Sequence, residues 1–250
     1  MMCPAFFVSS RNYVPGGKDR GRTMKNGLVR RLCLTGILAL VFYLLHDWVG
    51  ALYYPGYDRL SQAVSDLTAV SAPSAAVAGG LSQVYGLFSC LCGTLVCIVA
   101  YESRAGNRLF RLGVYLFGIM LWISAVGYAL FPLSEAGYAG TLQDVLHTYV
   151  ITSLVVALSI VSLVMIATGG FRYGGKLKIP AVLAAAALLC MFAGAVGVSV
   201  VPPAYFGVME RFSTYSAVVF TAVLGIYGYL GFFGGAAQAA QTRSTENTLY

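Results

Sequence analysis

The chain has 250 residues, of which 58% are hydrophobic and only 10% are charged, and its mean hydropathy is +0.77. A soluble domain carries roughly 25% charged residues, so this chain has too few to cover a surface in water. Composition therefore excludes a soluble globular enzyme, a disordered protein and a coiled coil. It predicts an all-α integral membrane protein. The net charge of +7 does not indicate nucleic-acid binding, because the basic residues lie in short clusters between apolar runs.

The two ends of the chain are polar. We expect residues 1–31 to form a disordered, basic cytoplasmic arm, and residues 234–250 to form a flexible cytoplasmic tail. Met24 opens a phrase that is typical of a true start, so translation from Met1 and from Met24 both remain open. The arm is too polar to be the apolar core of a signal peptide.

Six apolar runs between these ends are long enough to cross a hydrocarbon core of about 30 Å as helices. The predicted spans are Leu32–Leu52, Val77–Ala100, Leu109–Phe131, Val145–Thr168, Ile179–Val201 and Phe212–Phe233. Proline follows the third and fifth spans, as expected of a residue without a backbone N–H. Small residues such as Gly79 and Gly194 recur at helical spacing and indicate close packing of the helices. The sequence thus predicts a six-helix transmembrane domain over residues 32–233.

The distribution of basic residues predicts the orientation of the bundle. Of the 16 Lys and Arg residues, 14 lie in the two ends and in the second and fourth loops, whereas only Arg59 and Arg211 lie on the other side. The positive-inside rule then places both termini in the cytoplasm and the chain in the cell membrane as a multi-pass protein.

The first outer loop, from Tyr57 to Ala72, has apolar residues at the spacing of an amphipathic helix. Leu60, Val64 and Leu67 share one helical face with other apolar residues, and the opposite face is polar. We expect an amphipathic helix that lies on the outer leaflet or caps the bundle between the first two spans.

Most acidic residues and both histidines fall on the predicted outer side. His46 and Asp47 lie deep in the first span if that helix continues past Trp48, and at the interface if it breaks there. Ionisable groups at membrane depth are costly and often functional. Asp144 can instead serve as a helix N-terminal carboxylate, and Arg211 can pair with a carboxylate or bind a lipid phosphate.

These residues supply the candidate site, in which we expect His46, Asp66, His147 and Glu210 to converge. The catalytic candidates are His46, Asp66, Asp144 and His147; the binding candidates are Asp47, Ser65, Glu210 and Arg211; the candidate metal ligands are His46, Asp66 and His147. No cofactor is expected. Zinc or another divalent cation is the alternative, although a catalytic zinc ordinarily has three protein ligands and only two histidines are present.

Short phrases recur in order along the membrane part of the chain. They are His46-Asp47-Trp48, Tyr54-Pro55-Gly56-Tyr57-Asp58, Val64-Ser65-Asp66-Leu67 with Pro73 after it, Phe131-Pro132, then Gly137, Gly140 and His147, and Gly207-Val208-Met209-Glu210-Arg211. Over about residues 30 to 230 the chain resembles a bacterial and archaeal membrane family catalogued as domain of unknown function 998. The resemblance implies a six-helix bundle. The chain departs from the family pattern at two places. Glu135 stands in place of an Asp after Phe-Pro, and Val145 and Leu146 precede His147.

Three functions are compatible with the sequence. The first is a non-enzymatic membrane protein that binds a lipid headgroup or small solute in an outer polar cleft, with membrane lipids as partners. The second is a membrane-embedded hydrolase or transferase acting on lipid with a His/Asp site, in which Ser65, Asp66 and the histidines resemble part of the zinc set of ceramidase-type and progestin-receptor-type membrane hydrolases. The third is a small proton-coupled transporter.

Overall fold

A computed structural model describes residues 27–231, and within that range every regular element is helical. The six long helices are α2 (Thr35–Leu52), α3 (Ala75–Glu102), α4 (Arg108–Leu130), α6 (Ser153–Tyr173), α7 (Lys178–Val200) and α8 (Phe206–Leu230). The short helix α5 (Leu142–Val145) and a π-helical stretch, η2 (Leu146–Thr152), run directly into α6. Six helical segments of this described part are long and apolar enough to cross a membrane. The predicted six-helix architecture is confirmed.

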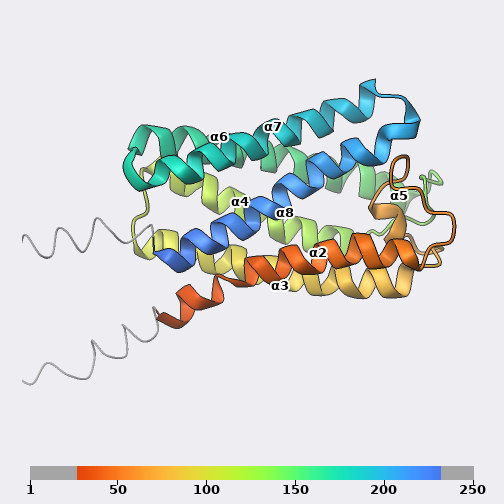
Figure 1. Cartoon of the computed structure of the whole chain (residues 1–250), viewed down its shortest axis with the longest axis horizontal. Helices are drawn as coiled ribbons and strands as arrows, with labels where there is room; N and C mark the ends of the chain where they lie inside the picture. The colour runs from red at the N-terminus through yellow and green to blue at the C-terminus, as the bar shows by residue number, and fades with distance from the viewer. Residues whose placement is uncertain (1–26, 232–250) are drawn as a thin grey trace, which may run out of the picture.

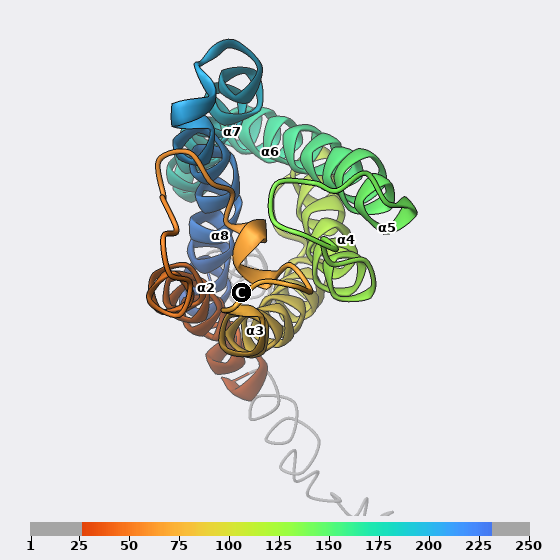
Figure 2. The same ribbon diagram turned by 90° about the vertical axis from the view of Figure 1, so that its right-hand side faces the viewer.

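The six helices form a ring in which α2, α3, α4, α6, α7 and α8 follow one another and α8 closes against α2 (Figure 2). Residues 27 and 231 lie at the same end of the bundle, and α5 lies at the other end (Figure 1). We call this second end the loop end, because it carries the segments 53–74 and 131–141. Both segments reach from the rim towards the centre of the ring (Figure 2).

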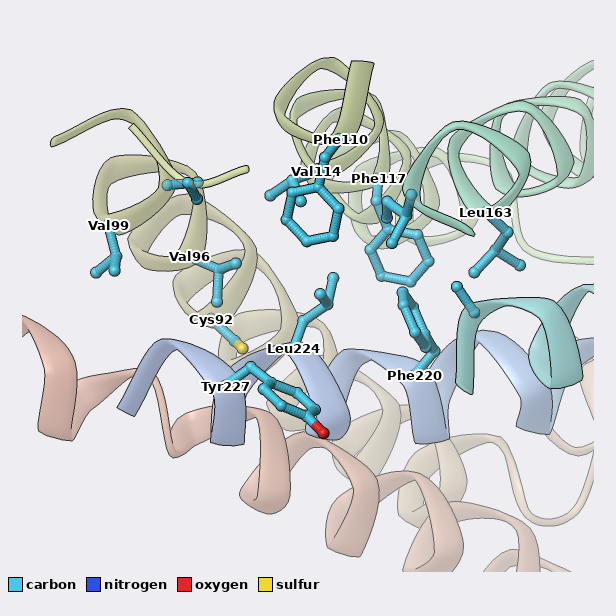
Figure 3. Close-up of a cluster of buried hydrophobic side chains, with 14 of the residues drawn as sticks. Cys92, Val96, Val99, Phe110, Val114, Phe117, Leu163, Phe220, Leu224 and Tyr227 are labelled. Carbon is cyan, nitrogen blue, oxygen red and sulfur yellow. The ribbon is translucent and has the colours of Figure 1, made fainter. Parts of the chain in front are cut away.

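The half of the bundle away from the loop end is filled by a hydrophobic core. The rings of Phe117 from α4 and Phe220 from α8 meet edge to face, with centroids 5.3 Å apart (Figure 3). Leu163 from α6 and Val96 from α3 belong to the same cluster, and all four side chains are buried. The core therefore joins α8 to the helices on the far side of the ring.

Some of the small residues allow helices to touch through their backbones. A Cβ on Gly194 of α7 would lie 2.5 Å from the backbone nitrogen of Ser213 and 2.6 Å from the carbonyl oxygen of Met209, both on α8. Gly79 of α3, by contrast, has nothing within 4 Å of the corresponding position. The helical spacing of small residues therefore predicted close helix packing correctly at Gly194 but not at Gly79.

The structure decides one alternative that the sequence left open and moves one expected helix boundary. The helix α2 continues without a break past Trp48 to Leu52, so His46 and Asp47 belong to the helix. The last span was expected to begin at Phe212, but α8 begins at Phe206, directly after a 3₁₀ turn over Pro203–Tyr205. Proline is pre-organised for a helical start. Glu210 and Arg211 consequently lie inside α8. The expected arm and tail fall almost entirely outside the described residues.

The amphipathic helix expected between the first two spans does not form. Only Ser65–Thr68 is helical, as a 3₁₀ turn named η1. Val64 and Leu67 are buried in the bundle instead of lying on its surface. The backbone N–H groups of Ala63 and Val64 are bound by the carboxylates of Asp66 and Glu210, which replace helical hydrogen bonds. The segment caps the bundle as an irregular loop, so this prediction was wrong in its secondary structure.

Candidate functional site

A buried ion pair joins α2 to α8 near the loop end. Nε and Nη2 of Arg211 each donate a hydrogen bond of 3.0 Å to one carboxylate oxygen of Asp47. Asp47 is only 1% exposed, and the Tyr215 hydroxyl, one turn beyond Arg211, donates to the same carboxylate. Two parallel bonds between a guanidinium and a carboxylate combine charge attraction with fixed geometry. The pair therefore fixes α2 and α8 relative to each other.

The remaining donors of Arg211 hold the loop that follows α2. Nη1 of Arg211 lies 2.8 Å from the carbonyl oxygen of Arg59, 3.1 Å from that of Gln62 and 2.9 Å from that of Gly207. Nη2 also donates to the Tyr57 hydroxyl at 2.7 Å. All five N–H groups of Arg211 are thus committed within the protein.

Two further residues let this loop lie directly on the start of α8. A Cβ on Gly207 would overlap the carbonyl oxygen of Gln62, so glycine permits the close approach. Burial raises the pKa of the Tyr57 phenol, and the hydroxyl donates to the carbonyl oxygen of Ala63 at 2.7 Å. The phenol therefore stays protonated and bridges Arg211 to the loop.

Arg59 is bound on one side only. Its Nη2 donates to the carbonyl oxygen of Asp47 at 2.8 Å and lies 3.4 Å from a carboxylate oxygen of the same residue. The guanidinium carbon lies 3.9 Å from the centre of the Trp48 ring, which places the charge over the aromatic face. Nε and Nη1 of Arg59 have no acceptor among the residues that the structure describes. Its side chain remains 29% exposed.

A groove of about 590 Å³ extends from these residues across α8, between α2 and α7. Figure 1 shows α8 crossing between the other two helices. The polar end of the groove is formed by Asp47, Arg59 and Arg211. The rest of its lining is mostly apolar and includes Leu183, Ala186, Ala187, Cys190, Phe212, Val219, Phe220 and Val223. Several of these side chains are exposed, so the groove opens sideways from the bundle.

Asp66 ties two loops together. Its carboxylate accepts hydrogen bonds from the backbone nitrogens of Ala63 (3.1 Å) and Gly137 (3.0 Å), which belong to the two loop-end segments. Asp66 is buried, and its neighbour Ser65 begins the η1 turn. The carboxylate is therefore occupied by structural hydrogen bonds.

Glu210 and Asp144 have similar roles. A carboxylate oxygen of Glu210 accepts from the Val64 nitrogen at 2.6 Å. Asp144 is the third residue of a capping box with Thr141, and it also accepts from the backbone nitrogen and hydroxyl of Ser134. Asp144 therefore lies in the first turn of a helix and caps it, as one interpretation of the sequence expected.

His147 lies in the π-helical stretch η2 and packs against Tyr128, with ring centroids 4.8 Å apart. Its Nδ1 is 2.7 Å from the carbonyl oxygen of Phe131, just before the Pro132 break. Because a carbonyl only accepts, Nδ1 carries the proton and Nε2 of the neutral ring is the basic nitrogen. The wider π turn is held at Thr152, whose hydroxyl donates to the His147 carbonyl and accepts from the Tyr128 hydroxyl.

His46 is buried without a polar partner. It is 4% exposed, both ring nitrogens lack a hydrogen bond within the described residues, and its ring meets Tyr43 edge to face at 5.6 Å. It neighbours the Asp47–Arg211 pair electrostatically. An unsatisfied buried ring nitrogen destabilises the fold by about 1–3 kcal/mol.

Glu210 links the sequence-predicted candidates electrostatically, because it interacts with Asp66 and also with Asp47 and Arg211. Asp66 interacts electrostatically with both Glu210 and His147, and Asp144 also interacts with His147. His46 and Asp47 accompany Arg211. In the described part of the chain, no three His, Cys, Asp or Glu side chains are placed to hold a metal ion. Within residues 27–231 the zinc alternative therefore has no set of three ligands.

Sequence reasoning did not select Arg59, Trp48, Tyr57 or Tyr215 as site residues. One signal was present, because Arg59 and Arg211 are the two cations on the side that is otherwise poor in Lys and Arg. Tyr215 follows Arg211 by one helical turn and therefore shares its face. The groove itself had no sequence signal, since its lining comes from α2, α7, α8 and a loop.

The comparisons with known proteins identify a family. A family model described as "Protein of unknown function (DUF998)" matches residues 37–227, which cover all six long helices in whole or in large part. No curated protein and no solved structure matches the chain.

Proposed function

The chain belongs to the DUF998 family of proteins of unknown function, and we propose that this polytopic membrane protein binds a membrane lipid in the groove between α2, α7 and α8. One observation carries the proposal: a groove of about 590 Å³ has a long apolar lining and a charged end formed by Asp47, Arg59 and Arg211. Its volume lies in the range of ligand sites, roughly 300–1,000 Å³. An apolar groove with one charged end matches an amphiphile.

The dimensions of the groove suit an acyl chain. Its α8 lining runs from Val208 to Val223, which corresponds to ~22 Å at the helical rise of 1.5 Å per residue. One leaflet of a bilayer has a hydrocarbon thickness of ~15 Å. A chain that enters sideways between α2 and α7 meets mostly apolar side chains beyond the charged end.

We further propose that the loop end faces the outside of the cell and that both termini are cytoplasmic. The distribution of Lys and Arg supports this orientation. The lipid headgroup then lies at the outer face, beside Arg59.

The groove supports binding better than catalysis or transport. None of His46, Asp66, Asp144 and His147 lines it. The carboxylates of Asp66 and Asp144 already hold loops and helix ends. His147, with its proton fixed on Nδ1, is the residue on which the hydrolase or transferase alternative would depend. Its position away from the groove separates it from the lipid that we propose.

Two matched variants test the proposal. Val219 on α8 and Val161 on α6 are both 47% exposed, but only Val219 lines the groove. In Val219→Trp the indole fills the groove, whereas in Val161→Trp it points away from the bundle.

Native mass spectrometry of protein extracted from membranes in mild detergent then measures the retained lipid. The wild type and Val161→Trp are expected to carry a tightly bound lipid, and Val219→Trp is expected to lose it. Equal lipid occupancy in all three proteins, or no retained lipid in any of them, would overturn the proposal.

A further inference from the structure

The charged end of the groove carries an unbalanced positive charge. The charged residues in its lining are Asp47, Arg59 and Arg211. Asp47 and Arg211 neutralise each other in a two-bond ion pair, with 3.0 Å for each bond. Arg59 is therefore the cation that this end of the groove leaves without a full counter-charge.

Arg59 also keeps hydrogen-bond donors for an external group. Arg211 has none left, because its five N–H groups bind Asp47, Tyr57 and backbone carbonyls. Stacking on Trp48 uses the face of the Arg59 guanidinium, and the N–H groups of Nε and Nη1 have no acceptor among the described residues. The N–H groups of Nη1 can each donate a charge-assisted hydrogen bond to a phosphate oxygen.

The carboxylate that lines the groove beside Arg59 is not available to a headgroup cation. The Asp47 carboxylate is buried and already accepts from Arg211 and Tyr215. Asp58, the neighbouring residue, accepts from the Leu60 nitrogen and the Ser61 hydroxyl and so holds its own turn. Among the charged residues that line this end of the groove, none offers a free carboxylate to a headgroup cation.

We propose that Arg59 binds the phosphate of a phospholipid with a net negative headgroup and thereby selects anionic lipids over zwitterionic ones. This proposal rests on the proposed function, since the acyl chain of that lipid occupies the groove. Trp48 and the Asp47 carbonyl position the guanidinium, and the phosphate completes its hydrogen bonds.

The test compares phosphatidylglycerol with phosphatidylcholine, added to delipidated protein in a neutral detergent and followed by native mass spectrometry. The wild type is expected to bind phosphatidylglycerol about tenfold more tightly than phosphatidylcholine. One charge-assisted interaction provides a difference of this size. In Arg59→Gln both lipids should bind with the affinity of phosphatidylcholine. Arg59→Lys keeps the charge but loses the planar guanidinium that stacks on Trp48, so its preference should be intermediate.

Arg108→Gln is the matched control, because Arg108 is an exposed arginine at the opposite end of the bundle. It should retain the full preference. Thermal unfolding of each variant, measured first, shows that the lipid affinities belong to folded protein; should Arg59→Gln fail to fold, the comparison of Arg59→Lys with the wild type decides.

The outcomes separate the two proposals. If wild type and Arg59→Gln show the same headgroup preference, or if the wild type shows none, the role of Arg59 is overturned. The groove proposal survives that result when Val219→Trp still abolishes binding of both lipids. If Val219→Trp binds both lipids like the wild type, the groove itself is not the binding site. Inorganic phosphate at the same concentration should not displace the lipid, because it lacks the acyl chain.

Discussion

Arg211 on α8 binds Asp47 on α2 through two hydrogen bonds of 3.0 Å each, across 164 residues of sequence. The same guanidinium holds the carbonyl oxygens of Arg59 and Gln62. One side chain thus connects two transmembrane helices and the loop that forms the charged end of the groove. The shape of the groove depends on this pair.

Removal of the negative partner should destabilise the protein strongly. Asp47→Asn leaves Arg211 without its counter-charge, and loss of one member of a buried pair costs about 3–5 kcal/mol. Thermal unfolding in detergent measures the effect. Glu102→Gln, at the exposed end of α3, is the control and should unfold within about 0.5 kcal/mol of the wild type.

The double variant Asp47→Asn/Arg211→Gln should recover part of the loss, because it leaves no unpaired charge. Equal unfolding temperatures for Asp47→Asn and Glu102→Gln would contradict the central position of the pair.

His147 provides a second prediction. If its main role is the bond from Nδ1 to the Phe131 carbonyl, His147→Ala should lower the free energy of unfolding by about 1–2 kcal/mol. The amide nitrogen of Asn occupies the position of Nδ1, and that of Gln the position of Nε2. His147→Asn should therefore be more stable than His147→Gln. The reverse order would show that Nε2 makes the more important interaction.

The glycines of the helix interfaces allow a matched comparison. Gly194→Ala introduces a Cβ at 2.5 Å and 2.6 Å from backbone atoms of α8, which cannot move aside without displacing the helix. We expect a loss of about 1–3 kcal/mol. Gly79→Ala meets nothing within 4 Å and should be neutral or stabilising by about 0.5–1 kcal/mol. Similar unfolding temperatures for the two variants would refute the predicted close contact of α7 with α8.

The orientation is testable by cysteine accessibility. Ala139 at the loop end and Lys176 at the opposite end are both exposed. In a background with Cys3→Ser, the remaining cysteines lie within the membrane-spanning helices. A membrane-impermeant maleimide added to intact cells should label Ala139→Cys and leave Lys176→Cys unlabelled. Labelling of Lys176→Cys alone would reverse the topology.

The fold was predictable because the membrane limits the alternatives. Without water in the bilayer, backbone groups must bond within their own segment, so long apolar runs such as Ala75–Glu102 become helices. The loop after α2 was not predictable from its pattern. Its backbone N–H groups bind Asp66 and Glu210, and the second of these is 146 residues distant from Val64.

The site was predictable in part for a similar reason. Arg211 was a candidate for a carboxylate or a lipid phosphate, and the structure pairs it with Asp47. Arg59 became a candidate only once that pairing was known, because its free donors are defined by what Arg211 and Asp47 already bind. Local pattern cannot reveal such a distribution of partners.

The central claim is that a lipid chain occupies the groove between α2, α7 and α8. A phosphatidylglycerol with a diazirine in its acyl chain, photolysed with the protein in bilayers and mapped by peptide mass spectrometry, tests it most directly. We predict that cross-links concentrate on groove residues such as Ala187, Cys190 and Val223, and that Val219→Trp removes them. Cross-links spread evenly over the exposed faces of α4 and α6, and unchanged in Val219→Trp, would contradict the claim.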